Sequence, residues 1–441
     1  MIDPSVRNEI PVGYVEDRQR ISVIMANFNG EAYIARAIRS VLEQTHTDLE
    51  LIVSDDGSSD KSCEIVRATM AQDHRVRLIE AKTAACGPAT ARNRALNLAT
   101  GDWVAIVDSD DIIHPERLSR LLHCALTLRS DLVADDLIHF GQGALRNNRT
   151  LLQDLRLSQP MTIDATALVS GNLGGCRNIP LGYLKPLIRR ATLGNTRYNE
   201  ALRIDEDHDL YLRLLLENAG FTLIPDAMHL YRRHAGSVSH RFDKASLHKM
   251  IAAQQSLLGA LGPEKATLGQ AIKKRMQDHE LQQQYICIVS ALKTRNTVFA
   301  AKQVLRNPRC VPLLVQSLIE RGQRQKVKQG IARQRKKISL CVAGASQQVG
   351  NPDYTIIHVP DAPGFYPAPS AAPVWAELAA LACEHDLDIV AYGRPGQYAL
   401  GLVPYFRTAQ IFSVQGEKLT KRTDEDIVAN KNSLEILAEE A

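Results

Sequence analysis

Apolar runs alternate with helix-spaced apolar positions along the N-terminal part of the chain. Each run is followed by a segment with helical periodicity, as Ile34, Ile38 and Val41 show after the first run. Repeated strand–helix–strand units predict an α/β domain with a doubly wound, mostly parallel sheet. The four runs expected to form buried strands are Ile21–Met25, Leu49–Val53, Val76–Ile79 and Trp103–Val107.

Acidic residues stand directly after two of these runs. Asp55-Asp56 follows the second run, and the tract Asp108-Ser109-Asp110-Asp111 follows the fourth. In such sheets, ligands bind outside the carboxyl ends of the strands. We therefore expect both acidic turns to lie at one ligand-binding edge.

The Asp108-Ser109-Asp110 spacing suits a divalent cation. Two carboxylates on a loop can each give an oxygen to Mg²⁺ or Mn²⁺ and leave positions open for phosphate oxygens. The alternative is a solvated acidic turn in which Asp111 caps a helix opened by Pro115. The position after an apolar strand favours the metal interpretation.

Asp56 is a candidate nucleotide contact. A carboxylate at a strand end can accept a hydrogen bond from the imide of uracil or from a ribose hydroxyl. The alternative is an Asx-type turn that caps the next helix. Because Asp60 and the neighbouring serines could supply that cap alone, the Asp55-Asp56 pair exceeds the structural need, which favours a functional role.

Three further segments carry candidate side chains. Arg92, in the GPATARN tract, stands near an expected helix start and could contact a diphosphate, unless it is an ordinary exposed arginine. The acidic tract Asp205–Asp209 could supply a general base, although a helix start alone would explain its charge. His234, beside two arginines, could bind a metal or phosphate, or lie on a surface loop.

The remaining chain predicts further segments. From Asp243 to Gln334 the pattern is helical and polar, and it ends in a strongly basic tract from Arg321 to Lys337. We expect an N-terminal extension (1–20), an α/β domain (21–242), a helical region ending in a basic linker (243–337) and a small C-terminal α/β module (338–441). The module's expected elements are strands at Ile338–Val342, Tyr354–Val359 and Asp388–Tyr392 and a helix at Trp375–Cys383.

Composition and charge argue against some classes of protein but do not identify a function. The 441 residues are 45% hydrophobic and 23% charged, and a net charge of +4 gives no indication of nucleic-acid binding. None of the eight cysteines forms a CxxC pair, so we expect reduced thiols in a cytoplasmic protein. The charged N-terminus does not suggest a signal peptide, and no apolar run is long enough to span a membrane.

Five segments, in this order and spacing, resemble the family 2 glycosyltransferases of the GT-A fold. They cover roughly residues 20–240: SVIMANFNGEAYIARAIRSVLEQT, LELIVSDDGSSD, GPATARNRALNLATGDWVAIVDSDD, DEDHDLYLRLL and YRRHAGSVS. Within the family, NIPLGYLKPLIRR and YRRHAGSVSH resemble bacterial succinoglycan-type exopolysaccharide enzymes, which add one sugar to a lipid-linked oligosaccharide. The QxxRW motif of the processive members is not found around Trp103 or Trp375.

The resemblance implies a role for each matching position. Ala26, Phe28 and Asp56 match residues that bind the nucleotide of a nucleotide-sugar donor. Asp108 and Asp110 match the DxD motif, with Asp110 as the more direct ligand of Mg²⁺ or Mn²⁺. The list is completed by Asp207 as catalytic base and His234 as a further metal or diphosphate contact.

The implied reaction is an inverting transfer to a hydroxyl of a glycan or a lipid-linked oligosaccharide. The basic tract then has two interpretations, a contact with an anionic membrane at the inner face of the cell or a solvated linker. Two other functions stay open at this point. One is a nucleotidyltransferase, although Asn27-Phe28-Asn29-Gly30 is not its phosphate loop, and the other is a non-catalytic sugar-nucleotide-binding protein.

Overall fold

The computed structural model describes residues 19–81, 85–140, 150–234, 242–315 and 317, together with five later strands. Residues 1–18 of the expected N-terminal extension lie outside the described residues. The same holds for residues 318–336, which include most of the basic tract, and for the helix expected at 375–383.

The first half of the α/β domain alternates strands and helices as the apolar runs predict. The elements are β1 (Ile21–Asn27), α1 (Ile34–Leu42), β2 (Leu49–Asp55), α2 (Ser62–Met70), β3 (Val76–Glu80), α3 (Pro88–Leu96), β4 (Trp103–Ile106), β5 (Ile112–Ile113) and α4 (Arg117–Thr127). Helix α4 begins two residues after Pro115, with Glu116 at its N-cap. Asp111 is therefore not its cap, because its buried carboxylate accepts a hydrogen bond from the Arg232 backbone N–H at 2.7 Å.

The second half contributes the following elements: β6 (Leu132–Phe140), η1 (Gln153–Leu155), β7 (Met161–Ile163), α5 (Ala165–Ser170), η2 (Leu181–Tyr183), β8 (Leu187–Arg189), α6 (Arg190–Leu193), α7 (Glu206–Leu216) and β9 (Phe221–Arg232). The acidic tract opens α7, as expected. Asp205 precedes this helix in a left-handed conformation, with φ of 73°, and its side chain makes no capping bond.

The described part of this domain forms a mixed sheet with strand order β3-β2-β1-β4-β8-β6-β9-β5, and β7 pairs with β9. Neighbours among β3, β2, β1 and β4 are parallel. The carboxyl ends of β2 and β4 consequently flank the end of β1 at one edge, and both acidic turns lie there.

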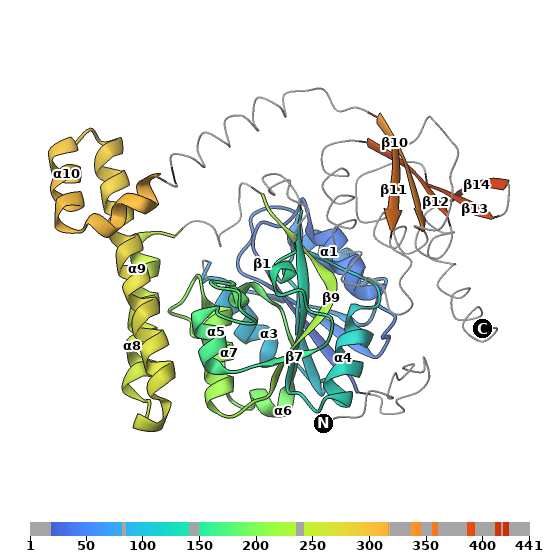
Figure 1. Ribbon diagram of the computed structural model, residues 1–441. Coiled ribbons are helices and arrows are strands. Elements are labelled where there is room, and N and C mark those ends of the chain that lie inside the picture. The colour runs from blue at the N-terminus through green and yellow to red at the C-terminus, as the bar shows by residue number, and fades with distance from the viewer. Residues whose placement is uncertain are drawn as a thin grey trace.

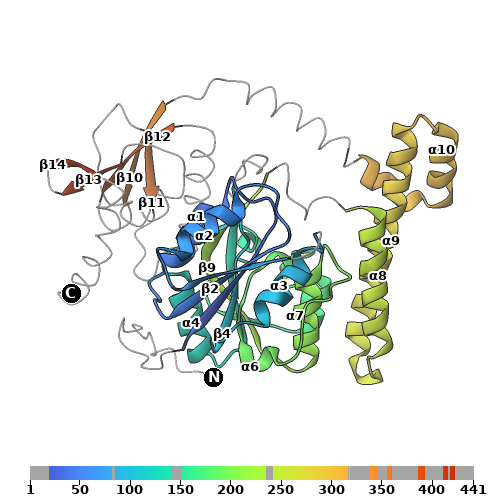
Figure 2. The same cartoon turned by 180° about the vertical axis from the view of Figure 1, so that it is seen from behind.

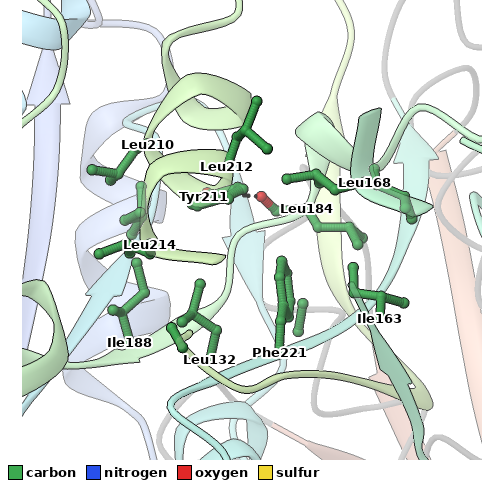
Figure 3. Packing of buried hydrophobic residues seen from close by; sticks show 14 of the residues in the cluster. Leu132, Ile163, Leu168, Leu184, Ile188, Leu210, Tyr211, Leu212, Leu214 and Phe221 are labelled. Carbon is green, nitrogen blue, oxygen red and sulfur yellow. Dashed lines mark hydrogen bonds between the residues drawn. The ribbon is translucent and has the colours of Figure 1, made fainter. Parts of the chain in front are cut away.

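Helices cover both faces of the sheet (Figures 1 and 2). Alternate residues of β1 divide between two apolar cores, because successive side chains of a strand point to opposite faces. Val23 packs with residues of α1, α2 and α4 on one face. Ile24 joins α3, α5 and α7 on the other. Figure 3 shows part of this second core, where Tyr211 and Phe221 pack beside Leu184.

A helical extension follows the α/β domain. It consists of α8 (Lys244–Gly259), η3 (Pro263–Lys265), α9 (Ala266–Lys293), α10 (Thr297–Arg306) and η4 (Pro308–Cys310). Helices α8 and α9 lie side by side (Figure 1). Leu268 and Ile272 of α9 join the apolar core that contains α5 and α7, so the extension packs against the α/β domain.

The strands described after residue 336 form a separate five-stranded sheet, in the order β11-β10-β12-β13-β14. Its elements are β10 (Lys337–Gly344), β11 (Thr355–Val359), β12 (Asp386–Tyr392), β13 (Ile411–Gln415) and β14 (Lys418–Arg422). The first three strands match the expected ones, and β10, β11, β12 and β13 pair in parallel. The last two strands were not expected, since neither segment has a long apolar run.

Candidate functional site

One cavity of about 1110 Å³ opens at the edge where the acidic turns lie. All eight side chains singled out from the sequence line it: Ala26, Phe28, Asp56, Arg92, Asp108, Asp110, Asp207 and His234. They come from the end of β1, from turns or helices that follow β1, β2, β3 and β4, from the start of α7 and from the residues after β9. The sheet topology thus brings together segments that are far apart in the sequence.

The two aspartates at the end of β2, Asp55 and Asp56, make different contacts. Asp55 holds the turn, because it accepts hydrogen bonds from the backbone N–H groups of Gly57 and Ser58 at 3.0 and 2.8 Å. Asp56 instead contacts the cavity wall. Its carboxylate accepts from the Gly87 backbone N–H at 2.6 Å and from Arg94 at 2.8 Å. Asp56 is therefore not needed for the turn itself.

Phe28 lies at the mouth of the cavity, with 53% of its surface exposed. A large aromatic ring left in solvent beside a cavity is available to stack on a planar ligand group. Ala26 and Asn27, the last two residues of β1, also line the cavity. The small side chain of Ala26 leaves room for a ligand group beside the strand.

A buried cluster of charges forms the floor of the cavity. Arg92 is 4% exposed, not the exposed helix arginine considered as an alternative. Its guanidinium lies 2.6 Å from Asp108 Oδ1 and 2.6 Å from Glu206 Oε1. Lys185 Nζ lies 3.0 Å from Asp108 Oδ2 and 2.6 Å from Asp207 Oδ2. We call these residues the charge cluster: Arg92, Asp108, Lys185, Glu206 and Asp207.

Burial and charge oppose each other in this cluster. Burial alone would raise the pKa of Asp108, but Lys185 and Arg92 outweigh it and hold that pKa well below its usual range. Burial would likewise lower the pKa of Lys185, and Asp108 and Asp207 raise it instead. Burial together with Asp207 raises the pKa of Glu206. Strongly perturbed carboxylates in a cavity are typical of catalytic sites.

Asp110 and His234 form a second polar group beside the charge cluster. His234 Nε2 lies 2.9 Å from Asp110 Oδ2, and both side chains are partly exposed to the cavity. The His234 ring packs against Tyr33 with centroids 4.9 Å apart, which fixes its position. Within the described residues no group of three or more His, Cys, Asp or Glu side chains has the arrangement of a metal site.

Lys185 and Arg275 are site residues that the sequence analysis missed. Lys185 stands between η2 and β8 in the apolar context of Leu184, Pro186 and Leu187, and a lone lysine in such a run is a signal of a buried ion pair. Arg275 comes from α9 and bonds Asp205 at 2.6 Å. No local pattern marks it, because its partner lies on another part of the fold.

The described cysteines and helices can be compared with the expectations of reduced thiols and of no membrane-spanning segment. The six described cysteines, at 63, 86, 124, 176, 287 and 310, are free thiols. Within the described residues, no helix combines the length and the hydropathy that crossing a bilayer requires.

Comparison with known proteins identifies the family of this chain. The model of the family described as "Glycosyl transferase family 2" matches residues 22–179. The succinoglycan biosynthesis protein ExoO of Rhizobium meliloti is 30% identical over 293 residues, which cover 65% of this chain and 82% of ExoO. ExoU of the same organism is 31% identical over 265 residues, 59% of this chain and 75% of that protein.

A solved structure, S. aureus TarS 1–349 in complex with UDP-GlcNAc, aligns with a TM-score of 0.48 and 22% identity over 58% of this chain and 72% of that one. The mixed sheet with helices on both faces is the expected GT-A arrangement, and the expected family is confirmed. The chain is a glycosyltransferase and belongs to glycosyl transferase family 2.

Proposed function

We propose that this glycosyltransferase moves one sugar from a UDP-sugar to a hydroxyl of a glycan or lipid-linked oligosaccharide, with inversion at the anomeric carbon. The observation that carries the proposal is the convergence of all eight candidate residues on one cavity floored by the charge cluster. The similarity to ExoO and ExoU, named for succinoglycan biosynthesis, supports an acceptor in exopolysaccharide or cell-surface polysaccharide synthesis.

The donor would occupy the edge formed by β1, β2 and α3. Phe28 would stack on the uracil ring of the donor, and Asp56 would accept a hydrogen bond from that ring. Ala26 leaves space for the nucleotide. The positive end of α3 at Gly87 and Pro88, which line the cavity, suits the diphosphate.

The side chains present fit a divalent cation at Asp110. Asp110 and His234 provide an oxygen and a nitrogen donor next to each other on the cavity wall, whereas both oxygens of Asp108 are held by Arg92 and Lys185. We therefore assign Mg²⁺ or Mn²⁺ to Asp110 first, with His234 and Asp108 as further candidates. When bound, the cation would act as a Lewis acid that stabilises the leaving diphosphate.

Asp207 would act as the base. Its Oδ2 is held by Lys185 at 2.6 Å, and its Oδ1 lies 3.5 Å from Arg92. The carboxylate takes the proton of the acceptor hydroxyl while the hydroxyl oxygen bonds to the anomeric carbon. The bond from that carbon to the diphosphate oxygen breaks, and UDP leaves with the electron pair. A single displacement of this kind inverts the configuration.

Contact with an anionic membrane is also part of the proposal. It would keep the enzyme near lipid-linked acceptors, and its basis is the basic tract from Arg321 to Lys337.

A screen of nucleotide sugars tests the proposed function. We expect one UDP-sugar to raise the melting temperature only when Mg²⁺ or Mn²⁺ is present, because binding to the folded state alone stabilises it. The same donor should be hydrolysed slowly without acceptor, and Asp110→Ala should remove both effects. Equal hydrolysis by the wild type and Asp110→Ala would refute the metal assignment, and no response to any UDP-sugar would refute the donor.

A further inference from the structure

Helix α9 forms a wall of the cavity opposite the α/β domain. Residues that are alternately four and three positions apart share one face of a helix, and one such stripe of α9 faces inward. The stripe comprises Leu268, Ile272, Arg275, His279, Gln282 and Ile286. Leu268 and Ile272 join one apolar core, and Ile286 packs against another. Between them the stripe becomes polar, and these polar residues line the cavity.

His279 is a buried polar residue of this stripe. It is only 9% exposed, and its Nδ1 has no hydrogen-bond partner among the described residues. Leaving a buried polar atom unpaired costs about 1–3 kcal/mol, so such an atom needs an explanation. His279 lines the cavity, but this nitrogen has almost no exposed surface, so a ligand in the cavity can bond it once the imidazole turns about its Cβ–Cγ bond.

The wall carries little net charge toward a ligand. Burial and the nearby Arg275 lower the pKa of His279 to about 4, so its ring is neutral at pH 7, with one donor and one acceptor nitrogen. Arg275 is paired with Asp205 at 2.6 Å. Of the two remaining charged residues that α9 contributes to the lining, Lys274 is positive and Asp278 negative. This balance favours hydroxyl groups over an anion.

Helix α8 adds an apolar part to the same wall. Phe242, just before α8, and Met250 both line the cavity. Apolar side chains beside neutral hydrogen-bonding groups suit a sugar, which presents C–H faces and hydroxyl edges. Arg275 contacts Asp205 and His208, which flank Glu206-Asp207, and His279 lies about one helical turn further along α9. The wall is therefore close to the proposed base.

We propose that His279 and Gln282, with Met250 and Phe242, form the acceptor subsite and bind the terminal sugar of an uncharged glycan through its hydroxyl groups. The inference rests on the proposed function, because it names where the second substrate of that reaction sits. It assigns to the helical extension a direct part in substrate binding.

Acceptor kinetics of the full-length protein test this subsite. The variants are His279→Ala and Gln282→Ala, with His248→Ala and Gln277→Ala as matched controls at exposed positions of α8 and α9. The probes are octyl β-glucoside, octyl β-galactoside and the charged octyl β-glucuronide, used with the donor found by the nucleotide-sugar screen. Donor hydrolysis without acceptor is measured in parallel.

We expect each subsite variant to raise KM for the neutral glycosides about tenfold or more, while donor hydrolysis stays within about twofold of the wild type. The controls should match the wild type in both assays. Unchanged KM in both subsite variants would overturn the proposal. An equal loss of donor hydrolysis in the subsite variants would overturn it as well. The same holds if the wild type transfers sugar to the glucuronide alone, or hydrolyses the donor without transfer to any neutral glycoside.

The two proposals fail in different ways. A wild type that neither binds nor hydrolyses a UDP-sugar would refute the proposed function, and the acceptor subsite with it. Intact donor hydrolysis combined with normal acceptor kinetics in His279→Ala and Gln282→Ala would refute the subsite alone.

Discussion

Replacing Lys185 by methionine tests whether the charge cluster depends on a buried ammonium. In the wild type, two cations contact three carboxylates, and Lys185 is 5% exposed. The pKa of Lys185 is raised above its usual value, so its contribution to stability is complete below about pH 10 and is lost only at higher pH. The pKa of Asp108 is lowered, so its contribution persists until strongly acidic pH.

The expected loss follows from the burial of the partners. In Lys185→Met, Arg92 alone faces Asp108, Glu206 and Asp207. Removing one partner of a buried ion pair costs about 3–5 kcal/mol. For a domain of this size, that loss corresponds to a fall in melting temperature on the order of 10 °C. The fall should be smaller at pH 5 than at pH 7.5, because a carboxylate of the cluster can then take up a proton and relieve the repulsion.

Thermal unfolding at pH 5, 6 and 7.5 measures this effect, with Lys273→Met as the control. Lys273 is an exposed lysine of α9 and should change little. Lys185→Arg keeps the charge and should recover part of the stability, although its planar head does not reproduce the ammonium contacts. A melting temperature equal to that of the control, or a loss that does not vary with pH, would refute the reasoning.

Three further predictions concern single side chains. Burial raises the pKa of Asp136 to about 7, so its ionised form destabilises the fold as pH rises from about 4 to 7. Asp136→Asn should gain at most about 4 kcal/mol in urea unfolding at pH 8 and nothing at pH 4; a gain at pH 4 would contradict this. Asp56→Asn should weaken UDP binding by about tenfold or more in calorimetry, without unfolding the turn that Asp55 holds; unchanged affinity would count against the base contact. Arg275→Met removes the ion pair of Asp205, whose backbone is held in a left-handed conformation with φ of 73°, and should lower the melting temperature by several degrees. A change equal to that of Lys273→Met would contradict this prediction.

The sequence was sufficient for the parts of the site that lie next to regular patterns. Asp56, Asp108 and Asp110 follow apolar strands, so the rule for carboxyl ends of parallel strands places them at one edge. Asp207 stands in an acidic helix start that holds more charge than capping requires. The resemblance to a family then linked these segments, which no periodicity could do.

Other residues depend on contacts between distant segments. Lys185 acquires its role only when β8 lies beside β4 and brings its ammonium to Asp108. His279 is a polar residue on an inward stripe, and only the folded structure shows that its Nδ1 has no hydrogen-bond partner among the described residues. The solvated-turn interpretation of Asp111 is wrong for the same reason. The pairing of β5 with β9 buries its carboxylate against His229 at 2.8 Å.

The most direct test of the account compares Asp207→Asn with the wild type in donor binding and sugar transfer. The amide keeps the size of the side chain but cannot take the acceptor proton. We predict that metal-dependent binding of the UDP-sugar changes by less than about threefold, while kcat for transfer falls by about 10²-fold or more. The wild-type product, followed by NMR, should have the inverted anomeric configuration. Transfer at the wild-type rate by Asp207→Asn, or a product of retained configuration, would contradict the proposed mechanism.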